Sequence, residues 1–359
     1  MTSANETILH IDLSKLEKNF NYLKKLLNPK TKIIAVVKAF AYGHGDIEVS
    51  KKLESLGIYA LWVSDFEEGV ILRKSGIKTK IIIANPGLKS YTEIIKYNLD
   101  VVIYNKPLLN LYCSNKTPVN IHIKFNTGMN RYGFNDHDTE YIISKITNNN
   151  HLNLSSICSH LSAAEDKVNV NVTLKQIEKF KLISEQFERL LGNKVNKHLL
   201  NSYGVLNFSK YQMDSVRLGI GIYGSTTDIN LKQISTLTSV VAQIRFVKKG
   251  DSIGYGNSFI AKENMKIAII PIGYADGINR QLSNNVGSVF INEYECPIVG
   301  EISMDSLAIN VSKHQVQEGE LVEIFGNQLS VYEISKKLNT IPYEIYSILN
   351  RRIKRIYSN

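Results

Sequence analysis

The sequence is poor in cysteine and has no long apolar run. Its 359 residues include three cysteines, Cys113, Cys158 and Cys296, which are far apart and form no CxxC pair. This spacing indicates neither a disulfide framework nor a zinc site, so we expect no metal and a reducing compartment. The N-terminal segment lacks a basic stretch followed by an apolar one, and no run approaches the roughly 18 apolar residues that cross a bilayer. We therefore expect a cytoplasmic protein without a membrane partner.

Acidic residues are outnumbered by basic ones, which gives a net charge of +10. An excess of this size can indicate a nucleic-acid partner or an anionic ligand. Basic and aromatic residues do not interleave as they do in nucleic-acid motifs, and the lysines are scattered as on solvated faces. The one dense basic run, from Arg351 to Arg355, is typical of a solvated tail or of one that caps an interface. We expect no nucleic-acid partner.

The first two-thirds of the chain alternates short apolar runs with helical patterns, as in parallel strands that are buried on both faces. Eight runs have this character: 33–37, 60–63, 80–84, 101–104, 119–125, 155–159, 197–200 and 215–220. The segments 14–17, 65–68 and 173–176 have the sequence of helix starts, and Gly192 of a helix end. The alternation predicts a (β/α)8 barrel. An open doubly wound sheet is the competing fold, but no G-x-G-x-x-G follows a strand to favour it.

After about residue 230 the pattern becomes mostly β. Strand-like runs cover 238–247, 265–272, 289–291, 307–311 and 321–324, and residues 331–338 read as a helix. No linker rich in Pro, Gly or Ser marks the change. We therefore predict an α/β protein with two domains, a barrel over residues 1–230 and a mostly β domain over residues 231–359.

Lys38 closes the first strand of the predicted barrel. It follows the apolar run 33–37 and precedes a tight polar turn, Tyr42-Gly-His-Gly. The carboxyl ends of barrel strands are where active sites lie. Partial desolvation at such a position lowers the pKa of an amine and makes it a nucleophile. Alone, Lys38 could simply be a lysine that ends a strand, but the adjoining turn favours a functional role.

Further segments, in order along the chain, carry polar and glycine-rich motifs. They are residues 124–133, 159–161, 198–202, 217–224, 254–259, 272–277, 303–305 and 340–344. Together with the Lys38 segment they resemble the alanine racemases, which depend on pyridoxal phosphate, and the resemblance extends from Ile11 to Arg355. The chain departs from the family pattern at Phe40 and at Asn126, where a small polar residue and an aspartate are usual. It also has Ser303 where cysteine is frequent.

The resemblance implies a cofactor pocket. Lys38 would carry pyridoxal 5'-phosphate as a Schiff base, His160 would stack on its ring, and Arg217 would donate a hydrogen bond to its pyridine nitrogen. Because arginine stays protonated, that nitrogen would remain neutral. The phosphate would be held by the hydroxyls and backbone N–H groups of Tyr42, Ser202, Gly219, Ile220 and Tyr343.

The resemblance also implies a reaction, the interconversion of L-alanine and D-alanine by two bases, Lys38 and Tyr255. Tyr255 would come from the partner subunit of a homodimer, as would Met304, whose backbone N–H would bind the substrate carboxylate together with Arg131. Supporting roles would fall to Asn201, Tyr274, Arg280, Asp305 and Lys124. Lys124 would be carbamylated or paired with an acid, and the sequence leaves both states open. D-alanine is a wall precursor, so the resemblance implies a bacterial cytoplasmic enzyme that serves peptidoglycan synthesis.

Three other functions stay open. A racemase of serine or lysine would share these motifs, although Tyr274 and Tyr343 favour a small side chain. A decarboxylase built on the same barrel would need a cysteine-bearing motif where this chain has Gly-Tyr255-Gly, and Cys296 is poorly placed to serve. A cofactor-binding protein made of a single barrel would lack the second domain that carries Tyr255 and Met304.

Overall fold

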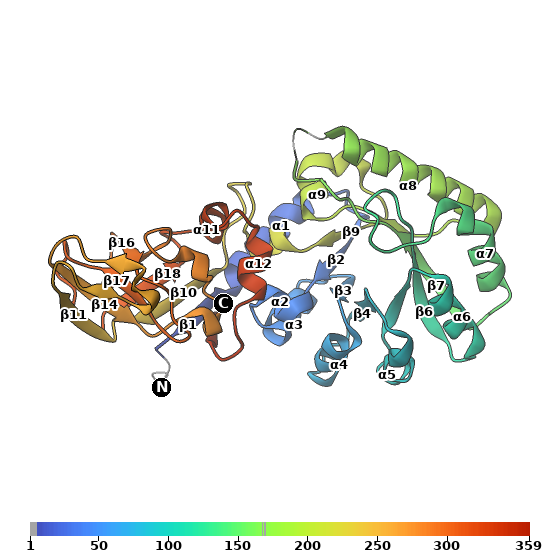
Figure 1. Ribbon diagram of the computed structural model, residues 1–359. Coiled ribbons are helices and arrows are strands. Elements are labelled where there is room, and N and C mark those ends of the chain that lie inside the picture. The colour runs from blue at the N-terminus through green and yellow to red at the C-terminus, as the bar shows by residue number, and fades with distance from the viewer. Residues whose placement is uncertain (1–5, 167, 169) are drawn as a thin grey trace. The chain divides into compact units, whose positions relative to one another are not determined.

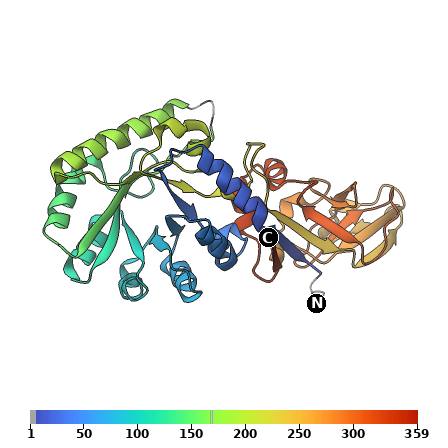
Figure 2. The ribbon, with the colours of Figure 1, turned by 180° about the vertical axis from the view of Figure 1, so that it is seen from behind.

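The structure, a computed structural model, describes residues 6–359 apart from 167 and 169. The chain forms two compact units (Figures 1 and 2). The barrel unit comprises Asn19–Ala41 and Asp46–Ile222. The β unit comprises the described residues up to Lys18, the short segment Tyr42–Gly45, and Tyr223–Asn359. The segment that follows Lys38 therefore passes from one unit to the other and back.

The barrel unit contains a closed parallel barrel of strands β2 to β9, which confirms the predicted fold class. Its strands are β2 (Lys32–Val36), β3 (Ala60–Val63), β4 (Lys80–Ile83), β5 (Asp100–Ile103), β6 (Val119–Lys124), β7 (Leu152–Cys158), β8 (Lys197–His198) and β9 (Ser215–Leu218). Every residue of β3 and β5 is buried, as expected for strands covered on both faces. The predicted strands match these positions, but β8 stops after two residues.

Helices follow the barrel strands along the chain, and in Figure 1 α4 to α7 lie outside the strands. Helix α1 (Leu13–Lys25) precedes the first barrel strand, and the segment labelled α2 (Lys38–Tyr42) has a left-handed backbone at residues 39–41. The other helices are α3 (Asp46–Ser55), α4 (Phe66–Lys74), α5 (Tyr91–Lys96), α6 (Lys106–Ser114), α7 (Thr139–Thr147), α8 (Val170–Leu191), α9 (Ser202–Phe208) and α10 (Ile220–Tyr223). Among the described residues, no helix is both long and apolar enough to cross a membrane.

The structure confirms some of the predicted helix starts and corrects others. Asp65 caps α4 in a full capping box with Glu68, as predicted. Helix α1 is present as predicted, but its predicted cap was wrong. Asp12 rather than Ser14 accepts the hydrogen bonds at its start, from the Ser14 hydroxyl at 2.6 Å and from the Lys15 N–H at 2.9 Å. An aspartate two residues upstream is an equally good cap. Helix α8 begins at Val170, before the predicted Thr173, and ends at Leu191 as predicted.

The β unit is built on a nine-stranded sheet in the order β11-β14-β17-β16-β15-β18-β10-β1-β19. Its strands are β1 (Ile8–Asp12), β10 (Ser235–Val240), β11 (Gln243–Val247), β14 (Met265–Ile270), β15 (Ser288–Ile291), β16 (Tyr294–Val299), β17 (Leu307–Asn310), β18 (Leu321–Phe325) and β19 (Lys354–Ser358). A small hairpin pairs β12 (Ser252–Ile253) with β13 (Phe259–Ile260). The helices α11 (Val331–Lys337) and α12 (Pro342–Ser347) complete the unit.

Two features of this sheet differ from the sequence analysis. The predicted strand 238–247 is interrupted at Val241, so β10 and β11 pair with different neighbours, β18 and β14. Residues 8–12 were placed with the barrel, but β1 lies between β10 and β19 in the nine-stranded sheet. Sequence periodicity identifies a strand but not its pairing partners, which are set by contacts far along the chain.

Candidate active site

The carboxyl ends of five barrel strands supply most of the predicted site residues. Lys38 follows β2, Lys124 is the last residue of β6, His160 follows β7, Ser202 begins α9 after β8, and Arg217 lies in β9. In a parallel barrel these ends meet at one rim. The barrel unit therefore brings together residues that are widely separated in the sequence.

The backbone directly after Lys38 forms a left-handed turn. Ala39, Phe40, Ala41 and Tyr42 have φ values of 53°, 56°, 51° and 53°, a region that costs a residue with a side chain about 1–2 kcal/mol. Glu68 stabilises the turn from α4, since one of its carboxylate oxygens accepts the Ala39 N–H at 2.6 Å. Its other oxygen accepts the Ser64 N–H at 2.7 Å. The left-handed backbone thus begins directly after the lysine.

Four cationic side chains influence one another at this rim. Burial lowers the pKa of Lys38, and the charge of Arg131 lowers it further, while Glu68 acts in the opposite direction. Burial also lowers the pKa of Lys124 to about 8, and Arg217, Arg131 and Lys38 add to this effect against an opposing contribution from Cys158. A positive region of this kind suits a ligand that carries negative charge. It also leaves the Lys124 amine, with its pKa of about 8, able to lose its proton close to neutral pH.

Arg217 is buried, and acceptors surround its guanidinium group. Its Nη1 donates to His198 Nδ1 and, at 3.2 Å, to the His198 carbonyl. Its Nη2 donates to the carbonyls of Ser159 at 2.6 Å and Leu199 at 3.0 Å and to His160 Nδ1 at 3.0 Å. Arg217 and His160 are therefore hydrogen-bonded to each other. Burial, followed by the charge of Arg217, holds the pKa of His160 well below its usual range, so this imidazole is neutral.

A cradle for an anion lies between α9 and the end of β9. The Ser202 hydroxyl accepts the Gly219 N–H at 2.9 Å and the Gly221 N–H at 3.2 Å. A Cβ atom on Gly221 would stand 3.2 Å from the Ser202 side chain, so the chain approaches closely because this residue is glycine. Asn201 caps α9, and its Oδ1 accepts the Gly204 N–H at 2.8 Å. A serine hydroxyl beside backbone N–H groups is a common way to hold a phosphate.

The loop from Asn126 to Gly133 is ordered by Asn126. Its Oδ1 accepts the N–H groups of Gly128 at 3.1 Å and Asn130 at 3.0 Å. An aspartate could accept the same two hydrogen bonds, so the departure at this position preserves the loop geometry and removes one negative charge. Arg131, at the end of this turn, is exposed.

In the β unit, Tyr42 and Tyr343 lie together. Their ring centroids are 5.6 Å apart, and Tyr42 also packs on Tyr223 at 4.8 Å. Burial raises the pKa of Tyr42, so its phenol keeps its proton. The two tyrosines therefore form one cluster, with the Tyr42 phenol in its protonated form.

The other predicted residues of the β unit lie on three adjoining loops. Tyr255, Tyr274 and Met304 are 70%, 45% and 54% exposed. The Ser303 carbonyl accepts the Tyr274 N–H at 3.0 Å, and a Cβ atom on Gly273 would lie 2.3 Å from that carbonyl oxygen. Gly254, Glu301 and Ser303 line a cleft of about 570 Å³. The Tyr255 turn and the Met304 loop thus border the same cleft.

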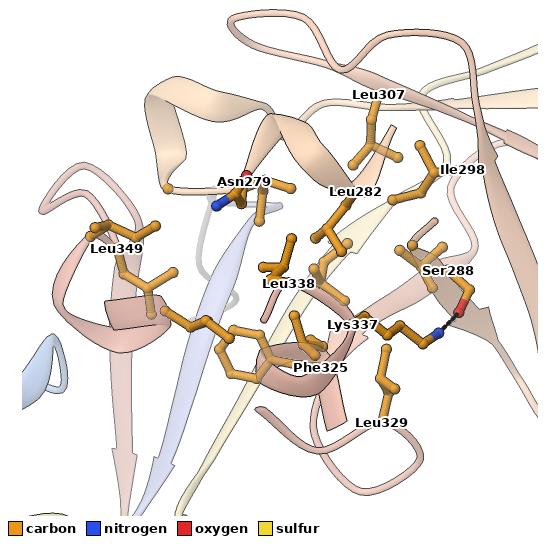
Figure 3. Close-up of a pocket in the computed structure, with 18 residues that line it drawn as sticks. Asn279, Leu282, Ser288, Ile298, Leu307, Phe325, Leu329, Lys337, Leu338 and Leu349 are labelled. Atoms are coloured by element: carbon orange, nitrogen blue, oxygen red, sulfur yellow. Dashed lines mark hydrogen bonds between the residues drawn. The ribbon is translucent and has the colours of Figure 1, made fainter. Parts of the chain in front are cut away.

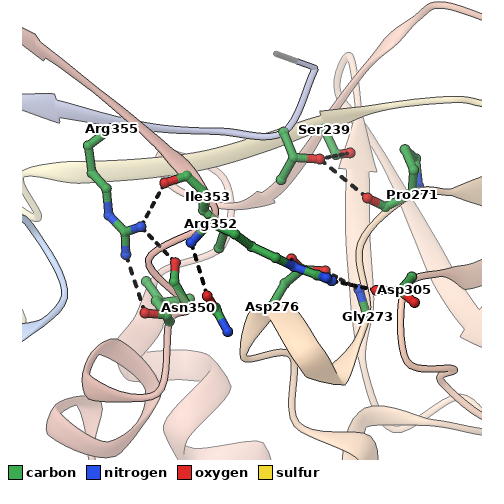
Figure 4. Close-up of polar contacts among 11 residues, drawn as sticks. Ser239, Pro271, Gly273, Asp276, Asp305, Asn350, Arg352, Ile353 and Arg355 are labelled. Carbon is green, nitrogen blue, oxygen red and sulfur yellow. Dashed lines mark hydrogen bonds and ion pairs between the residues drawn. The ribbon is translucent and has the colours of Figure 1, made fainter.

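An arginine of the basic tail joins two of these loops. Arg352 Nε donates to Asp276 at 2.6 Å, and Arg352 Nη2 donates to Asp305 at 2.6 Å (Figure 4). Asp276 also accepts the Gly273 N–H at 2.9 Å. The expectation of a solvated or interface-capping tail was therefore incomplete, because Arg352 ties the Tyr274 turn to the Met304 loop. Arg280 lies nearby in a different ion pair, with Glu301 at 3.0 Å.

Sequence reasoning missed Glu68 and Arg352 as residues that order the site. The capping-box pattern identified Glu68 as a helix cap but gave no sign of its bond to Ala39. Nothing in a run of basic residues distinguishes the one that binds two aspartates. The hydrogen bonds of Glu68 and Arg352 can be identified only from the three-dimensional arrangement of the strands and loops.

A second cavity, also in the β unit, is a poor candidate for a site. It is lined mainly by leucine, isoleucine and phenylalanine side chains between α11, α12 and the sheet (Figure 3). Lys337 lies at its edge and donates to the Ser288 hydroxyl at 3.2 Å. Its volume of about 30 Å³ leaves room for water but not for an organic ligand. No group of three or more histidine, cysteine or acidic residues among the described residues is arranged to bind a metal.

The charge of Arg131 leads to a prediction for Lys38. Replacing Arg131 by methionine should raise the pKa of the Lys38 amine toward that of an ordinary lysine, because a positive neighbour is removed. The pH dependence of acylation of Lys38 by an amine-selective reagent, followed by peptide mass spectrometry, measures this shift. The variant Arg189→Gln, on the outer helix α8, should leave the profile unchanged. An identical profile for Arg131→Met and the parent chain would contradict the electrostatic argument.

Comparisons with known proteins agree with these features. Residues 11–227 match the family model "Alanine racemase, N-terminal domain" and residues 234–357 match "Alanine racemase, C-terminal domain". The chain is 37% identical to the alanine racemase of Fusobacterium nucleatum, over 98% of this chain and 99% of that one.

Solved structures agree as well. The alanine racemase of Clostridium difficile 630 superposes with a TM-score of 0.93 at 28% identity, covering 99% of this chain and 97% of that one. The alanine racemase of Bartonella henselae, solved with covalently bound pyridoxal phosphate, gives a TM-score of 0.90 at 29% identity over 99% of this chain and 100% of that one. With its barrel, its strand-end lysine and both family domains matched in order, this chain belongs to the alanine racemase family.

Proposed function

We propose that this chain interconverts L-alanine and D-alanine with pyridoxal 5'-phosphate as cofactor. The observation that carries the proposal is the set of groups at the barrel rim. Lys38 supplies an amine of lowered pKa, Arg217 supplies a buried donor, and Ser202 with Gly219 supplies an anion cradle. These three match the aldehyde, the pyridine nitrogen and the phosphate of the cofactor, so the residues present fit the group.

Each residue of the pocket has a distinct task. Ser202 and the N–H groups of Gly219 and Ile220 would hold the phosphate, with the phenols of Tyr42 and Tyr343 as further donors. Arg217 donates hydrogen bonds and cannot accept one, so it would bind the unprotonated pyridine nitrogen. Neutral His160, held by Arg217, would lie against the ring.

Racemisation requires a base on each face of the α-carbon. When bound, pyridoxal phosphate withdraws electrons from that carbon and acidifies its proton. Lys38 would remove or return the proton on one face, and the Tyr255 phenol would do so on the other, an exchange that general acid–base chemistry permits when both pKa values suit the working pH. Arg131 and the Met304 N–H would fix the substrate carboxylate. The Tyr274 and Tyr343 rings would leave room for a small side chain, which favours alanine over serine or lysine.

The decarboxylase alternative requires a reactive cysteine near the site. Cys296 lies in β16, is fully buried and has its pKa raised to about 11 by burial, which argues against a thiolate nucleophile. The exposed group in the corresponding segment is the Tyr255 phenol. This supports racemisation as the function.

The first experiment assays racemisation directly. The purified chain with pyridoxal phosphate should convert L-alanine to D-alanine and show a visible absorption band. Lys38→Ala should lose both, whereas Tyr255→Phe should keep the band and lose activity by roughly a hundredfold or more, because only one base remains. Tyr294→Phe, an exposed tyrosine on β16, is the matched control and should retain full activity. A band with release of carbon dioxide and no racemisation would reassign the chain to the decarboxylases, and no band would refute the role of Lys38.

We also propose that the working unit is a homodimer with shared sites. The exposed Tyr255, Tyr274 and Met304 form an apolar and aromatic surface of the kind that a second protein covers. In a dimer, Lys38 of each copy would meet Tyr255 of the other. The free thiols of all three cysteines support a cytoplasmic location, and the family supports a role in supplying D-alanine to peptidoglycan.

Shared sites have a measurable consequence. Mixing the inactive variants Lys38→Ala and Tyr255→Phe, with exchange of subunits, should restore about a quarter of the parent activity, because half of the dimers would be mixed and each would contain one intact site. Sedimentation of the mixture confirms that dimers are present. Continued inactivity of a dimeric mixture would show that each site is built from one chain.

Lys124 is proposed to carry a carbamate. Its amine, with a pKa of about 8, would attack carbon dioxide, form an N–C bond and release a proton. The negative carbamate would offset the charges of Arg131, Arg217 and Lys38. Carbon-13 NMR in labelled bicarbonate should show one bound carbamate signal that is absent in Lys124→Arg. The same signal in that variant, or no signal in the parent chain, would exclude a carbamate at this residue.

A further inference from the structure

A hydrogen-bonded series of polar side chains runs across adjacent barrel strands, from Arg217 to Asp100. Arg217 in β9 bonds to His198 in β8, whose Nε2 lies 3.0 Å from the Ser156 hydroxyl in β7. That hydroxyl lies 2.6 Å from His122 Nδ1 in β6. His122 Nε2 lies 3.5 Å from Asp100 Oδ2 in β5. Five neighbouring strands thus contribute one side chain each, and the relative exposure of every member is 4% or less.

The chemistry of the two ends fixes the direction of the hydrogen bonds. A guanidinium group has donors only, and a carboxylate has acceptors only. His198 Nδ1 must therefore accept from Arg217, so its proton is on Nε2 and points to Ser156. The serine hydroxyl then donates to His122 Nδ1, and the His122 proton is on Nε2 and points to Asp100. For neutral imidazoles, this is the one arrangement in which each contact pairs a donor with an acceptor.

Neighbouring residues contact both ends of this hydrogen-bonded series. Burial, and then the charge of Arg217, holds the pKa of His198 well below its usual range, which agrees with a neutral ring. The Trp62 ring packs against Arg217 at 5.3 Å and against His198 at 5.7 Å. At the other end, the Asn120 amide donates to Asp100 Oδ1 at 2.9 Å, and Arg73 is close enough to interact with the Asp100 charge.

Asp100 is the first residue of β5, whereas Lys38 and His160 follow the ends of their strands. The hydrogen-bonded series therefore links the amino-terminal side of the barrel with the rim that carries the proposed cofactor site. A carboxylate is the usual partner that fixes the orientation of an imidazole. Here two imidazoles and a hydroxyl lie between the carboxylate and the guanidinium.

We propose that Asp100, His122, Ser156 and His198 act as positioning residues for Arg217. By fixing both histidine tautomers, they present a lone pair to Arg217 Nη1 and so hold its Nη2 toward His160. The inference deepens the proposed function, because Arg217 is the group that would bind the pyridine nitrogen. It predicts that a change at Asp100 reaches Arg217 only through Ser156.

The tautomers are tested by nitrogen-15 NMR of histidine-labelled protein without cofactor. His122 and His198 should each show an unprotonated Nδ1 and a protonated Nε2, assigned with His122→Gln and His198→Gln. A protonated Nδ1 in either ring would overturn the proposal. A doubly protonated His122 would also overturn the proposal, because the serine hydroxyl would then have no acceptor within the series.

Coupling is tested by a double-variant cycle of Asp100→Asn and Ser156→Ala. Asp100→Asn keeps the shape of the side chain but replaces the carboxylate, which only accepts hydrogen bonds, by an amide. It should shift the His198 Nδ1 resonance and lower kcat roughly tenfold. KM should stay within about twofold of the parent value. In the Ser156→Ala background the same substitution should change neither the His198 Nδ1 resonance nor kcat. Equal effects in both backgrounds would refute transmission through the serine.

Controls separate this inference from a loss of stability and from the proposed function. Ser184→Ala removes a buried serine of α8 that donates to the Phe180 carbonyl, and it should leave kcat and the His198 signal unchanged. Thermal unfolding of each variant identifies any that fail to fold. The NMR measurements need no turnover, so they decide the inference even if the chain does not racemise alanine.

Discussion

The burial of one guanidinium group constrains the whole barrel rim. A buried charge is costly unless it is surrounded by partners, and Arg217 is satisfied by three backbone carbonyls and two imidazole nitrogens. Two of the carbonyls belong to His198, which ends β8, and to Leu199, which follows it, and the third belongs to Ser159, which follows β7. Burial lowers the pKa values of His160, His198 and Lys124, and the charge of this guanidinium group lowers them further.

The left-handed turn after Lys38 follows a similar logic. Four residues with side chains adopt a backbone that each of them disfavours, and Glu68 offsets part of the cost by accepting the Ala39 N–H. Residues held in such regions cluster at functional sites. Because the turn leads from the barrel unit into the β unit, the same segment carries Lys38 in one unit and Tyr42 in the other. The strain is thus located where the two parts of the proposed site are joined through the chain.

The sequence predicted the barrel well because buried parallel strands are short apolar runs that repeat. It also predicted which strand ends carry polar groups, and the structure brings Lys38, His160, Ser202 and Arg217 to those ends. It could not predict partners set by distant pairing, such as β1 in the second sheet or Arg352 between two aspartates. Nor could it show that His122, Ser156 and Asp100 align, since an isolated polar residue in a strand gives no sign of its neighbours across the barrel.

The pairing of β1 with β10 and β19 has a consequence for the order of folding. β1 contains residues 8–12 and its parallel neighbour β19 contains residues 354–358, so this part of the sheet joins segments from near both ends of the sequence. During synthesis the barrel strands, complete by Leu218, can close while the ribosome is still translating the second family domain. β1 must wait with one edge unpaired until β19 emerges. At that stage the nascent chain would contain every barrel strand and one unpaired strand edge, the kind of surface that chaperones shield.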